Sequence, residues 1–192
     1  MIILASASPR RAELLRQIGA PFRVAVPAIE ELTGSALPPV ELVQENARRK
    51  ALAMASEAGG LPVLAADTVV ALGGEIFGKP RDAADAVRML ERFAGRAHEV
   101  YTGVAIAARE GIETAAARTV VEFAPLTSEM IRRYVATGEP LDKAGAYAAQ
   151  GRAAVFITRL EGSFSNVVGL PLHLTVTLAE RAGIDLYDDD GA

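Results

Sequence analysis

The chain of 192 residues contains no cysteine and only two histidines. Without cysteine there are no disulfide bonds and no thiolate zinc site, and two histidines that lie far apart in the sequence are too few for a histidine-rich metal site. A hard cation held by carboxylates stays open, because carboxylates supply the oxygen ligands that such cations prefer.

Long apolar runs are missing as well. Although 51% of the residues are hydrophobic, charges interrupt every stretch before it reaches the roughly 20 apolar residues of a membrane span. The N-terminus lacks the basic region, the long apolar run and the cleavage site of a secretory leader. We therefore expect a soluble, cytoplasmic protein with no membrane partner.

A strong excess of one charge is missing too, because the net charge is −4 and the basic residues are dispersed. This argues against a broad nucleic-acid surface, so no nucleic-acid partner is expected, but local capture of a triphosphate stays open. The chain has no repeat and no linker, and its length fits one domain over residues 1–192. We expect two lobes in this domain and a disordered acidic tail at 188–192.

Strand and helix patterns alternate along the chain. Apolar runs with turn signals predict strands over residues 2–4, 22–26, 61–66, 100–107, 119–123 and 155–160. Prolines and glycine stops predict helices that begin at Pro9 and at Pro38–Pro39, and further helices over 127–136 and 171–182. Asp82 is predicted as the N-cap of another helix, which ends at Gly95. This mixture predicts the α/β class with a mixed sheet.

Two arginines stand where the first helix is expected to begin. After the apolar segment Ile2–Leu4, Ser8 fits an N-cap and Pro9 fits the first helical position, so that Arg10 and Arg11 fall in the first turn. There they oppose the positive end of the helix dipole, which favours an offsetting anion such as a phosphate. The alternative is that both guanidinium groups are simply solvated.

Two acidic positions are candidates for chemistry. Asp67 follows the apolar strand over 61–66, and ligands of α/β sheets bind beyond the ends of such strands. Its alternative role is to cap the turn with Thr68. The pair Glu30 and Glu31 follows another strand and is the weaker candidate, because adjacent glutamates before a loop are usually solvated.

Two lysines are candidates for binding phosphate. Lys50 lies one turn beyond Asn46 on the helix after Pro39, where it can reach a phosphate or face water. The expected apolar side of this helix consists of Val40, Val43, Ala47, Leu52 and Met54. The segment Gly73–Lys79 matches part of a P-loop, but Pro80 stands where a magnesium-binding hydroxyl is required, so we reject an ATPase loop and retain Lys79 alone.

The sequence does not support a catalytic role for the other candidate nucleophiles and bases. The segment Gly162–Ser165 does not place a serine between two glycines, so it is not the nucleophile elbow of a serine hydrolase. His98 and His173 have no partner at a catalytic spacing, and both are interpreted as structural residues.

These motifs resemble the Maf, or septum-formation-inhibitor, family of nucleoside triphosphate pyrophosphatases practically from end to end. The motifs that match in order and approximate spacing are Leu4–Arg11, Ala66–Thr68, Gly78–Pro80, Asp142–Tyr147 and Gly169–Pro171. The resemblance implies a mixed, elongated β-sheet with flanking helices, in two lobes around a deep cleft, similar to inosine triphosphate pyrophosphatases.

The resemblance also implies a reaction, in which water cleaves a nucleoside triphosphate between the α- and β-phosphates to give the monophosphate and pyrophosphate. Asp67 matches the family's proton acceptor, and Glu31 and Asp67 are the expected ligands of Mg²⁺ or Mn²⁺. The residues expected to bind the substrate are Ser6, Arg10, Arg11, Lys50, Thr68, Lys79 and Gln150. Among them, Arg10, Thr68 and Gln150 match positions tied to substrate choice.

Within the family, Ala144–Tyr147 followed by Gln150 resembles the branch that acts on dTTP and UTP, and modified pyrimidine triphosphates stay open as substrates. The departures from the family pattern are Ala65 and Ala148 in place of glycine and Phe164 in place of tyrosine. The alternatives are the 7-methyl-GTP branch, or a nucleotide-binding regulator of septum formation in which hydrolysis is incidental. A homodimer also stays open.

Overall fold

The computed structural model describes residues 1–33 and 37–187, and it confirms the α/β class with a mixed sheet. The sheet consists of β1 (Ile2–Ala5), β2 (Phe22–Ala25), β3 (Val63–Leu72), β4 (Glu75–Phe77), β5 (Ala97–Ala108), β6 (Gly111–Phe123) and β7 (Ile157–Glu161). Its order is β2-β1-β3-β5-β6-β7, and β4 pairs with β3. Strand β1 is parallel to β2 and β3, whereas the β3–β4 and β6–β7 pairs are antiparallel.

The chain divides into two compact units that share the long strands of the sheet. The first unit comprises Met1–Asp67, Thr102–Ala117 and the chain from Gly169 onward, and the second comprises Thr68–Tyr101 and Arg118–Val168. The disordered tail predicted at 188–192 lies outside the described residues. Among the residues that are described, no helix is long and apolar enough to cross a membrane.

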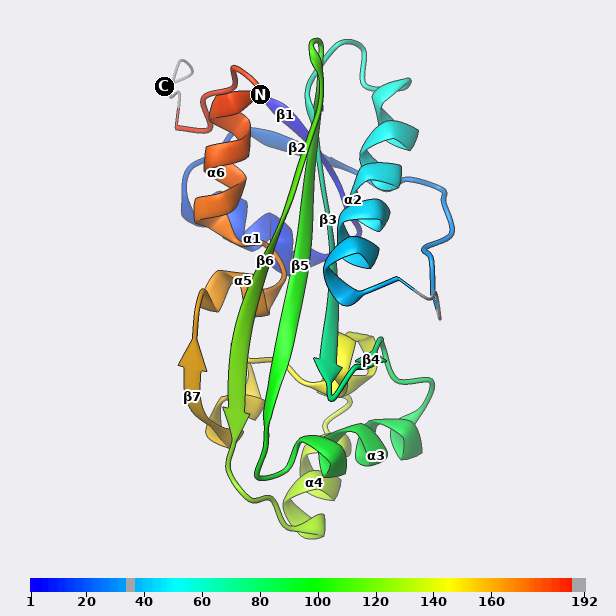
Figure 1. The fold of residues 1–192 in the computed structure, drawn as a ribbon, viewed down its shortest axis with the longest axis vertical. Helices are drawn as coiled ribbons and strands as arrows, with labels where there is room; N and C mark the ends of the chain where they lie inside the picture. The colour runs from blue at the N-terminus through cyan, green and yellow to red at the C-terminus, as the bar shows by residue number, and fades with distance from the viewer. Residues whose placement is uncertain (34–36, 188–192) are drawn as a thin grey trace. The chain divides into compact units, whose positions relative to one another are not determined.

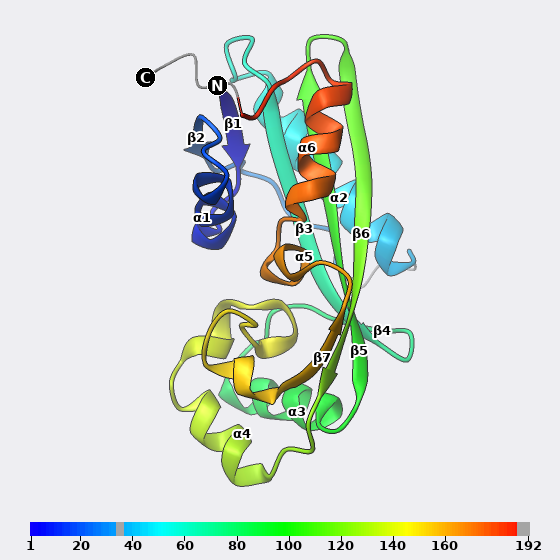
Figure 2. The same ribbon diagram turned by 90° about the vertical axis from the view of Figure 1, so that its left-hand side faces the viewer.

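Helices cover both faces of the sheet in the first unit (Figure 1, Figure 2). Helix α2 (Pro39–Ala55) lies on one face, while α1 (Pro9–Gln17) and α6 (Leu172–Arg181) lie on the other. The core between α2 and the strands is built from small side chains that include Ala47, Ala51, Ala65 and Ala105. Such side chains let the axis of α2 approach the sheet closely.

Gly103 of β5 is necessary for this close approach. A Cβ atom at Gly103 would clash with the backbone carbonyl of Val43 in α2. Because backbone atoms cannot move aside as the end of a flexible side chain can, any larger residue would push α2 away from the sheet. Gly103 therefore helps to set the distance between α2 and the strands, on which the contacts of the polar side chains of α2 depend.

The buried face of α2 differs from the sequence prediction. Val40 and Leu52, which were expected on the apolar side, are 40% and 44% exposed. The buried residues of the helix are Leu42, Val43, Asn46, Ala47, Lys50, Ala51 and Met54. The prediction is thus right for Val43, Ala47 and Met54 and wrong for Val40 and Leu52, and the buried stripe also contains two polar residues one turn apart.

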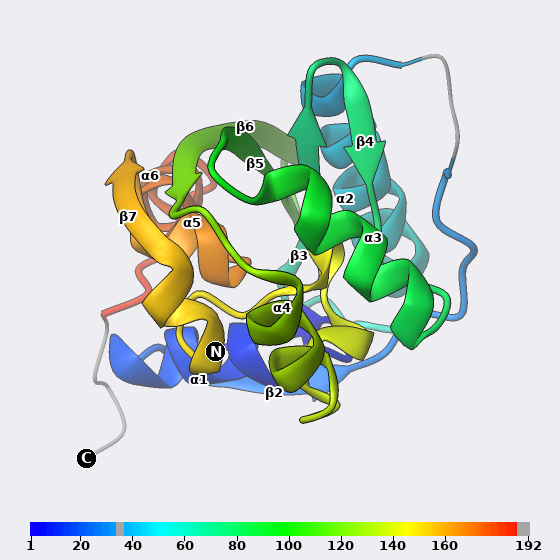
Figure 3. The ribbon, with the colours of Figure 1, turned by 90° about the horizontal axis from the view of Figure 1, so that it is seen from below.

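The second unit packs its helices around an aromatic core. Helices α3 (Ala83–Phe93) and α4 (Ser128–Val135) are neighbours, as Figure 3 shows. The predicted N-cap Asp82 is confirmed, since it accepts a hydrogen bond from the Asp85 amide at 2.7 Å. Thr127, predicted as the first residue of the next helix, is its N-cap and accepts a hydrogen bond from the Met130 amide at 3.2 Å. A short helix, α5 (Phe164–Val168), and three 3₁₀ helices within 139–156 complete this unit.

The P-loop-like segment is a hairpin. Gly73 and Gly74 form the turn between β3 and β4, with φ values of 59° and 86° that suit glycine at both central positions of a tight turn. A P-loop instead connects a strand to a helix. The rejection of an ATPase loop is therefore confirmed.

His98 lies in the aromatic core of the second unit, as its structural interpretation requires. Its Nε2 is 2.9 Å from the Tyr147 hydroxyl, and its ring packs against Phe93 and Phe123. Burial lowers the pKa of His98 to about 4 from an ordinary value of 6.5. The neutral ring is consequently the form that fits the core.

This shift of the pKa predicts that acid destabilises the fold through His98. The unfolded chain binds the proton below about pH 6.5 while the folded chain resists it down to about pH 4, so stability is complete above this window and falls with pH inside it. From pH 7 to pH 5 the free energy of unfolding should fall by about 2 kcal/mol more in the wild type than in His98→Phe. Urea unfolding of both proteins at the two pH values measures this. Equal losses of unfolding free energy in the wild type and in His98→Phe would contradict the assignment of this pH dependence to His98.

Candidate functional site

Lys50 lies between two carboxylates in the first unit. Its Nζ is 2.5 Å from Oε1 of Glu31 and 2.8 Å from Oδ1 of Asp67. The Lys50 and Asp67 side chains are only 9% and 8% exposed, whereas that of Glu31 is 49% exposed. Lys50 also donates to the carbonyl oxygen of Ala66 at 3.3 Å. All three donors of the ammonium group thus meet protein oxygens, and Glu31 and Asp67 point at one positively charged position.

Asn46 contacts the second oxygen of Asp67. Its Nδ2 donates to Oδ2 of Asp67 at 2.9 Å and to the carbonyl oxygen of Leu32 at 3.2 Å. Its Oδ1 accepts from the Leu32 amide at 2.8 Å. The sequence prediction does not include Asn46 among the site residues. Its position four residues before Lys50, on the same face of the helix, is the sequence signal that pointed to it.

Asp67 is not at the end of its strand, and this part of the prediction is wrong. Strand β3 runs from Val63 to Leu72 and continues through Asp67, because its second half pairs with β4. The neighbouring strand β1 instead ends at Ala5, and it pairs with β3 through Ile3 opposite Val63 and Leu4 opposite Leu64. Asp67 therefore lies beyond the carboxyl end of β1, where a parallel sheet places ligands.

The turn after β1 presents Ser6 and Arg11. Oγ of Ser6 accepts from the Ser8 amide and from a terminal guanidinium nitrogen of Arg11, both at 3.1 Å. Nε of Arg11 donates to the carbonyl oxygen of Gly169 at 2.8 Å. Ser8 has the expected extended backbone of an N-cap, but its side chain makes no capping hydrogen bond.

Arg11, in the helix that follows this turn, interacts electrostatically with the carboxylates of Asp67 and Glu31. Burial lowers the pKa of Arg11, while the negative charges of Asp67 and Glu31 act in the opposite direction and the charge of Arg10 adds to the lowering. The guanidinium group therefore lies within electrostatic reach of both carboxylates. The structure thus brings Ser6 and Arg11 into the same region of the first unit as the cluster of Lys50, Glu31 and Asp67.

Of the other predicted substrate residues, three belong to the second unit. Thr68 follows Asp67 in β3 and is partly exposed, whereas Lys79 and Gln150 are exposed. Lys79 follows Gly78, whose carbonyl oxygen accepts from the Gly145 amide at 3.0 Å. Arg10, in the first unit, is partly exposed.

A buried network holds the segment that carries Gln150. The hydroxyl of Tyr134 donates to Oε1 of Glu139 at 2.9 Å and accepts from the Ala148 amide at 3.1 Å. The carboxylate of Glu139 also accepts from the Arg152 amide at 3.0 Å. These hydrogen bonds hold the backbone on both sides of Gln150, whose side chain is exposed.

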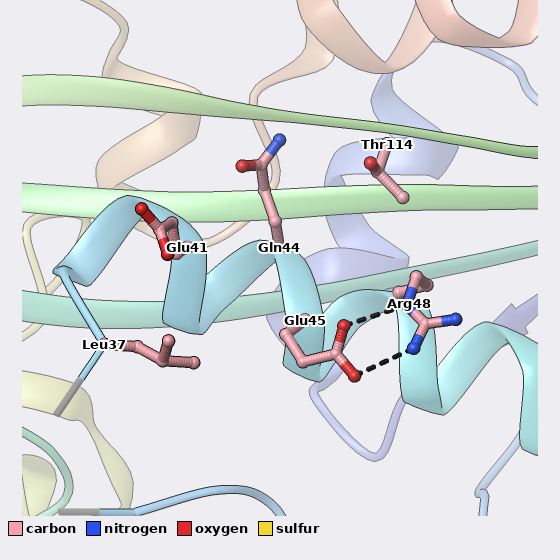
Figure 4. Close-up of a pocket in the computed structure, with 6 residues that line it drawn as sticks. All are labelled: Leu37, Glu41, Gln44, Glu45, Arg48 and Thr114. Atoms are coloured by element: carbon pink, nitrogen blue, oxygen red, sulfur yellow. Dashed lines mark hydrogen bonds and ion pairs between the residues drawn. The ribbon is translucent and has the colours of Figure 1, made fainter. Parts of the chain in front are cut away.

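A separate pocket lies along the other side of α2, and Figure 4 shows it. Its lining residues are Leu37, Glu41, Gln44, Glu45, Arg48 and Thr114. Arg48 is paired with Glu45 at 2.8 and 2.9 Å, and Glu41 adds a second acid, so the described lining carries two acids and one cation. Because a triphosphate needs cations, this pocket does not suit one, and none of the predicted site residues lines it.

Solved structures support the fold. The chain is similar to a HAM1 protein from Coxiella burnetii, with a TM-score of 0.52 and 18% identity over 93% of this chain and 98% of that one. It is also similar to the Ham1 protein of Staphylococcus aureus, with a TM-score of 0.50 and 16% identity over 95% of this chain and 98% of that one. The protein thus has the α/β architecture of Ham1 proteins, with an acid and cation cluster beyond the end of β1.

The sequence comparisons identify the family. A family model described as Maf-like protein matches residues 1–182. A dTTP/UTP pyrophosphatase from Symbiobacterium thermophilum is 52% identical over 97% of this chain and 96% of its own length. One from Myxococcus xanthus is 52% identical over 97% of this chain and 94% of its own length. The chain belongs to the Maf-like protein family, as its motifs indicated.

Proposed function

We propose that this protein is a nucleoside triphosphate pyrophosphatase that hydrolyses dTTP and UTP to the monophosphate and pyrophosphate. The observation that carries the proposal is identity near 50% with curated dTTP/UTP pyrophosphatases over almost the whole chain. The cluster of Lys50, Glu31 and Asp67 supports it, because this cluster supplies an acid that can act as a base together with nearby cations.

The carboxylates present fit a divalent cation. Within the residues that the structure describes there is no group of three or more acids and histidines that could hold a metal on its own. Glu31 and Asp67 nevertheless point at the same positive charge, and Mg²⁺ is commonly held by one or two carboxylates together with substrate phosphates. We propose these two residues as ligands of Mg²⁺ or Mn²⁺. When bound, such an ion lowers the pKa of water and neutralises phosphate charge.

The roles of the protein side chains follow from their chemistry. Asp67 is the proposed base that orients the attacking water and accepts its proton. Arg10 and Arg11 are proposed to bind phosphate oxygens, for which the planar guanidinium group suits bidentate contacts, and Lys79 to supply a compact charge. Lys50 is a proposed phosphate contact as well, although in the structure its donors hold the carboxylates.

The proposed function predicts turnover by the purified protein. Given dTTP, UTP, CTP, dATP and 7-methyl-GTP at equal concentration with Mg²⁺, it should release pyrophosphate fastest from dTTP and UTP, and the monophosphate should appear in equal amount. A preference for 7-methyl-GTP would reject the dTTP/UTP branch. Nucleotide binding without formation of a monophosphate would favour a nucleotide-binding regulator instead.

The same assay tests the divalent cation. Removal of metal with EDTA should reduce the turnover of dTTP to background, and added Mg²⁺ or Mn²⁺ should restore it. Unchanged turnover in EDTA would contradict the proposed role of Glu31 as a metal ligand while leaving the hydrolase intact.

A further inference from the structure

Asn46 is the one polar side chain of α2, other than Lys50, that is buried against the proposed catalytic acid. It is 2% exposed, and its amide makes hydrogen bonds at 2.8, 2.9 and 3.2 Å. A buried amide in the apolar stripe of a helix is unfavourable unless its polar atoms are satisfied. Here its oxygen and its nitrogen both have partners, so burial costs little, and the partners explain why a polar residue is placed there.

The orientation of the Asn46 amide follows from these partners. Its oxygen faces the Leu32 amide, which is a donor, and its nitrogen faces the Leu32 carbonyl and the Asp67 carboxylate, which are acceptors. A flipped amide would oppose donor to donor and acceptor to acceptor at every contact. One orientation of Asn46 therefore satisfies the whole set, and the network is rigid.

Asn46 and Lys50 together hold the carboxylate of Asp67. They lie one helical turn apart on the same face of α2, and each bonds to a different oxygen of Asp67, at 2.9 and 2.8 Å. A carboxylate held at both oxygens from one rigid helix has a fixed rotamer. Preorganisation of this kind matters for a catalytic base, because a displacement of about 1 Å can cost on the order of 100-fold in rate.

Asn46 also fixes the segment that carries Glu31. Residues 26–33 have no regular secondary structure, yet both backbone groups of Leu32 bond to the Asn46 amide. Since Leu32 follows Glu31 directly, this pair of hydrogen bonds anchors Glu31 to α2. One side chain thus links the two carboxylates that the proposed reaction requires.

We propose that Asn46 is a positioning residue of the reaction, which orients Asp67 and anchors Glu31 so that both carboxylates face one cation site. The proposal rests on the proposed pyrophosphatase function. Asn46 does not contact substrate in this role. It acts through Asp67 and through the backbone of Leu32.

Two substitutions separate its contacts. Asn46→Leu has a similar volume and removes every hydrogen bond of the amide. Asn46→Asp keeps an acceptor for the Leu32 amide but removes the donor to Asp67. The matched control is Gln44→Leu on the same helix, which makes the same chemical change in the separate pocket, whose lining includes none of Glu31, Asn46, Lys50 and Asp67.

The expected result is a fall in kcat for dTTP of about 10- to 100-fold in both Asn46 variants, with KM changed less than about threefold, because the phosphate-binding cations are untouched. Gln44→Leu should keep the wild-type kcat. Hydrogen exchange at the Leu32 amide should accelerate in Asn46→Leu and stay slow in Asn46→Asp. This exchange measurement does not depend on turnover.

Several outcomes would overturn the role of Asn46. An active wild type with an unchanged kcat in folded Asn46→Leu would overturn it, and so would a loss that appears only in KM or only as a lower thermal midpoint. An unchanged rate of hydrogen exchange at the Leu32 amide in Asn46→Leu would contradict the proposal that Asn46 anchors the segment of Glu31. A wild type that does not hydrolyse dTTP would instead overturn the proposed function, which is a separate result.

Discussion

Asp67→Asn is expected to lower kcat for dTTP by about 100- to 10,000-fold, which is the usual contribution of a positioned general base. The amide cannot accept a proton from water at neutral pH. The substitution also replaces one of the two oxygens with an NH₂ group. A donor then faces a donor in place of either the bond from Asn46 at 2.9 Å or the bond from Lys50 at 2.8 Å. KM should change little, since Arg10, Arg11 and Lys79 remain.

A matched control separates chemistry from stability. Asp85 is also a buried carboxylate, and it accepts from Arg81 at 2.9 Å and from Arg88 at 2.7 Å in the second unit. Asp85→Asn should lower the thermal midpoint and keep the wild-type kcat, whereas Asp67→Asn should lower the midpoint and also lower kcat, so that the loss of kcat at Asp67 alone reports chemistry. Pyrophosphate release and thermal unfolding of both variants measure this. Near-normal turnover by Asp67→Asn would remove Asp67 from the role of base.

Lys50→Met is expected to destabilise the protein by about 3–5 kcal/mol, because removal of one partner leaves the carboxylate of Asp67 buried without its ammonium. Methionine fills a similar volume, so the loss comes from charge rather than from a cavity. Glu31 and Asp67 would then face each other across the space that Lys50 held. Turnover should fall as well, since the acid loses one of its two orienting contacts.

The same variant should respond more strongly to divalent cations. Mg²⁺ or Mn²⁺ that binds the folded state raises the unfolding temperature, and the rise grows with the logarithm of its affinity. Two carboxylates without the ammonium they share should bind the ion more tightly, so the midpoint of Lys50→Met should rise more than that of the wild type. Arg48→Met on the same helix is the control, because its pair with Glu45 lies at the surface and contributes little. Equal shifts in Lys50→Met and the wild type would contradict a cation site at these carboxylates.

Local sequence signals were sufficient to predict most of the helices and strands. Asp82 and Thr127 are short polar residues before amphipathic segments, and both cap the helices that were predicted at these positions. Gly73 and Gly74 form a turn because only glycine adopts two successive positive φ values at low cost. Such features depend on a few neighbouring residues, so the sequence displays them directly.

Other features escaped prediction because they depend on distant partners. Strand β4 and helix α5 are short and lack a distinct pattern, and β4 is stabilised by its pairing with β3. The continuation of β3 through Asp67 has the same cause, since the pairing with β4 outweighs the low strand propensity of aspartate. The exposure of Val40 and Leu52 in α2 follows from how the helix docks on the sheet.

The sequence by itself determined the class of fold, most of the secondary structure, the family, and the residue types that suit a metal-bound triphosphate. Only the tertiary structure decided that Lys50 pairs with Glu31 and Asp67, and that Asn46 links the same two carboxylates. The physical reason is that caps, turns and periodicity act between near neighbours in the chain. A buried ion pair instead depends on the approach of α2 to β3, which small core residues and Gly103 make close.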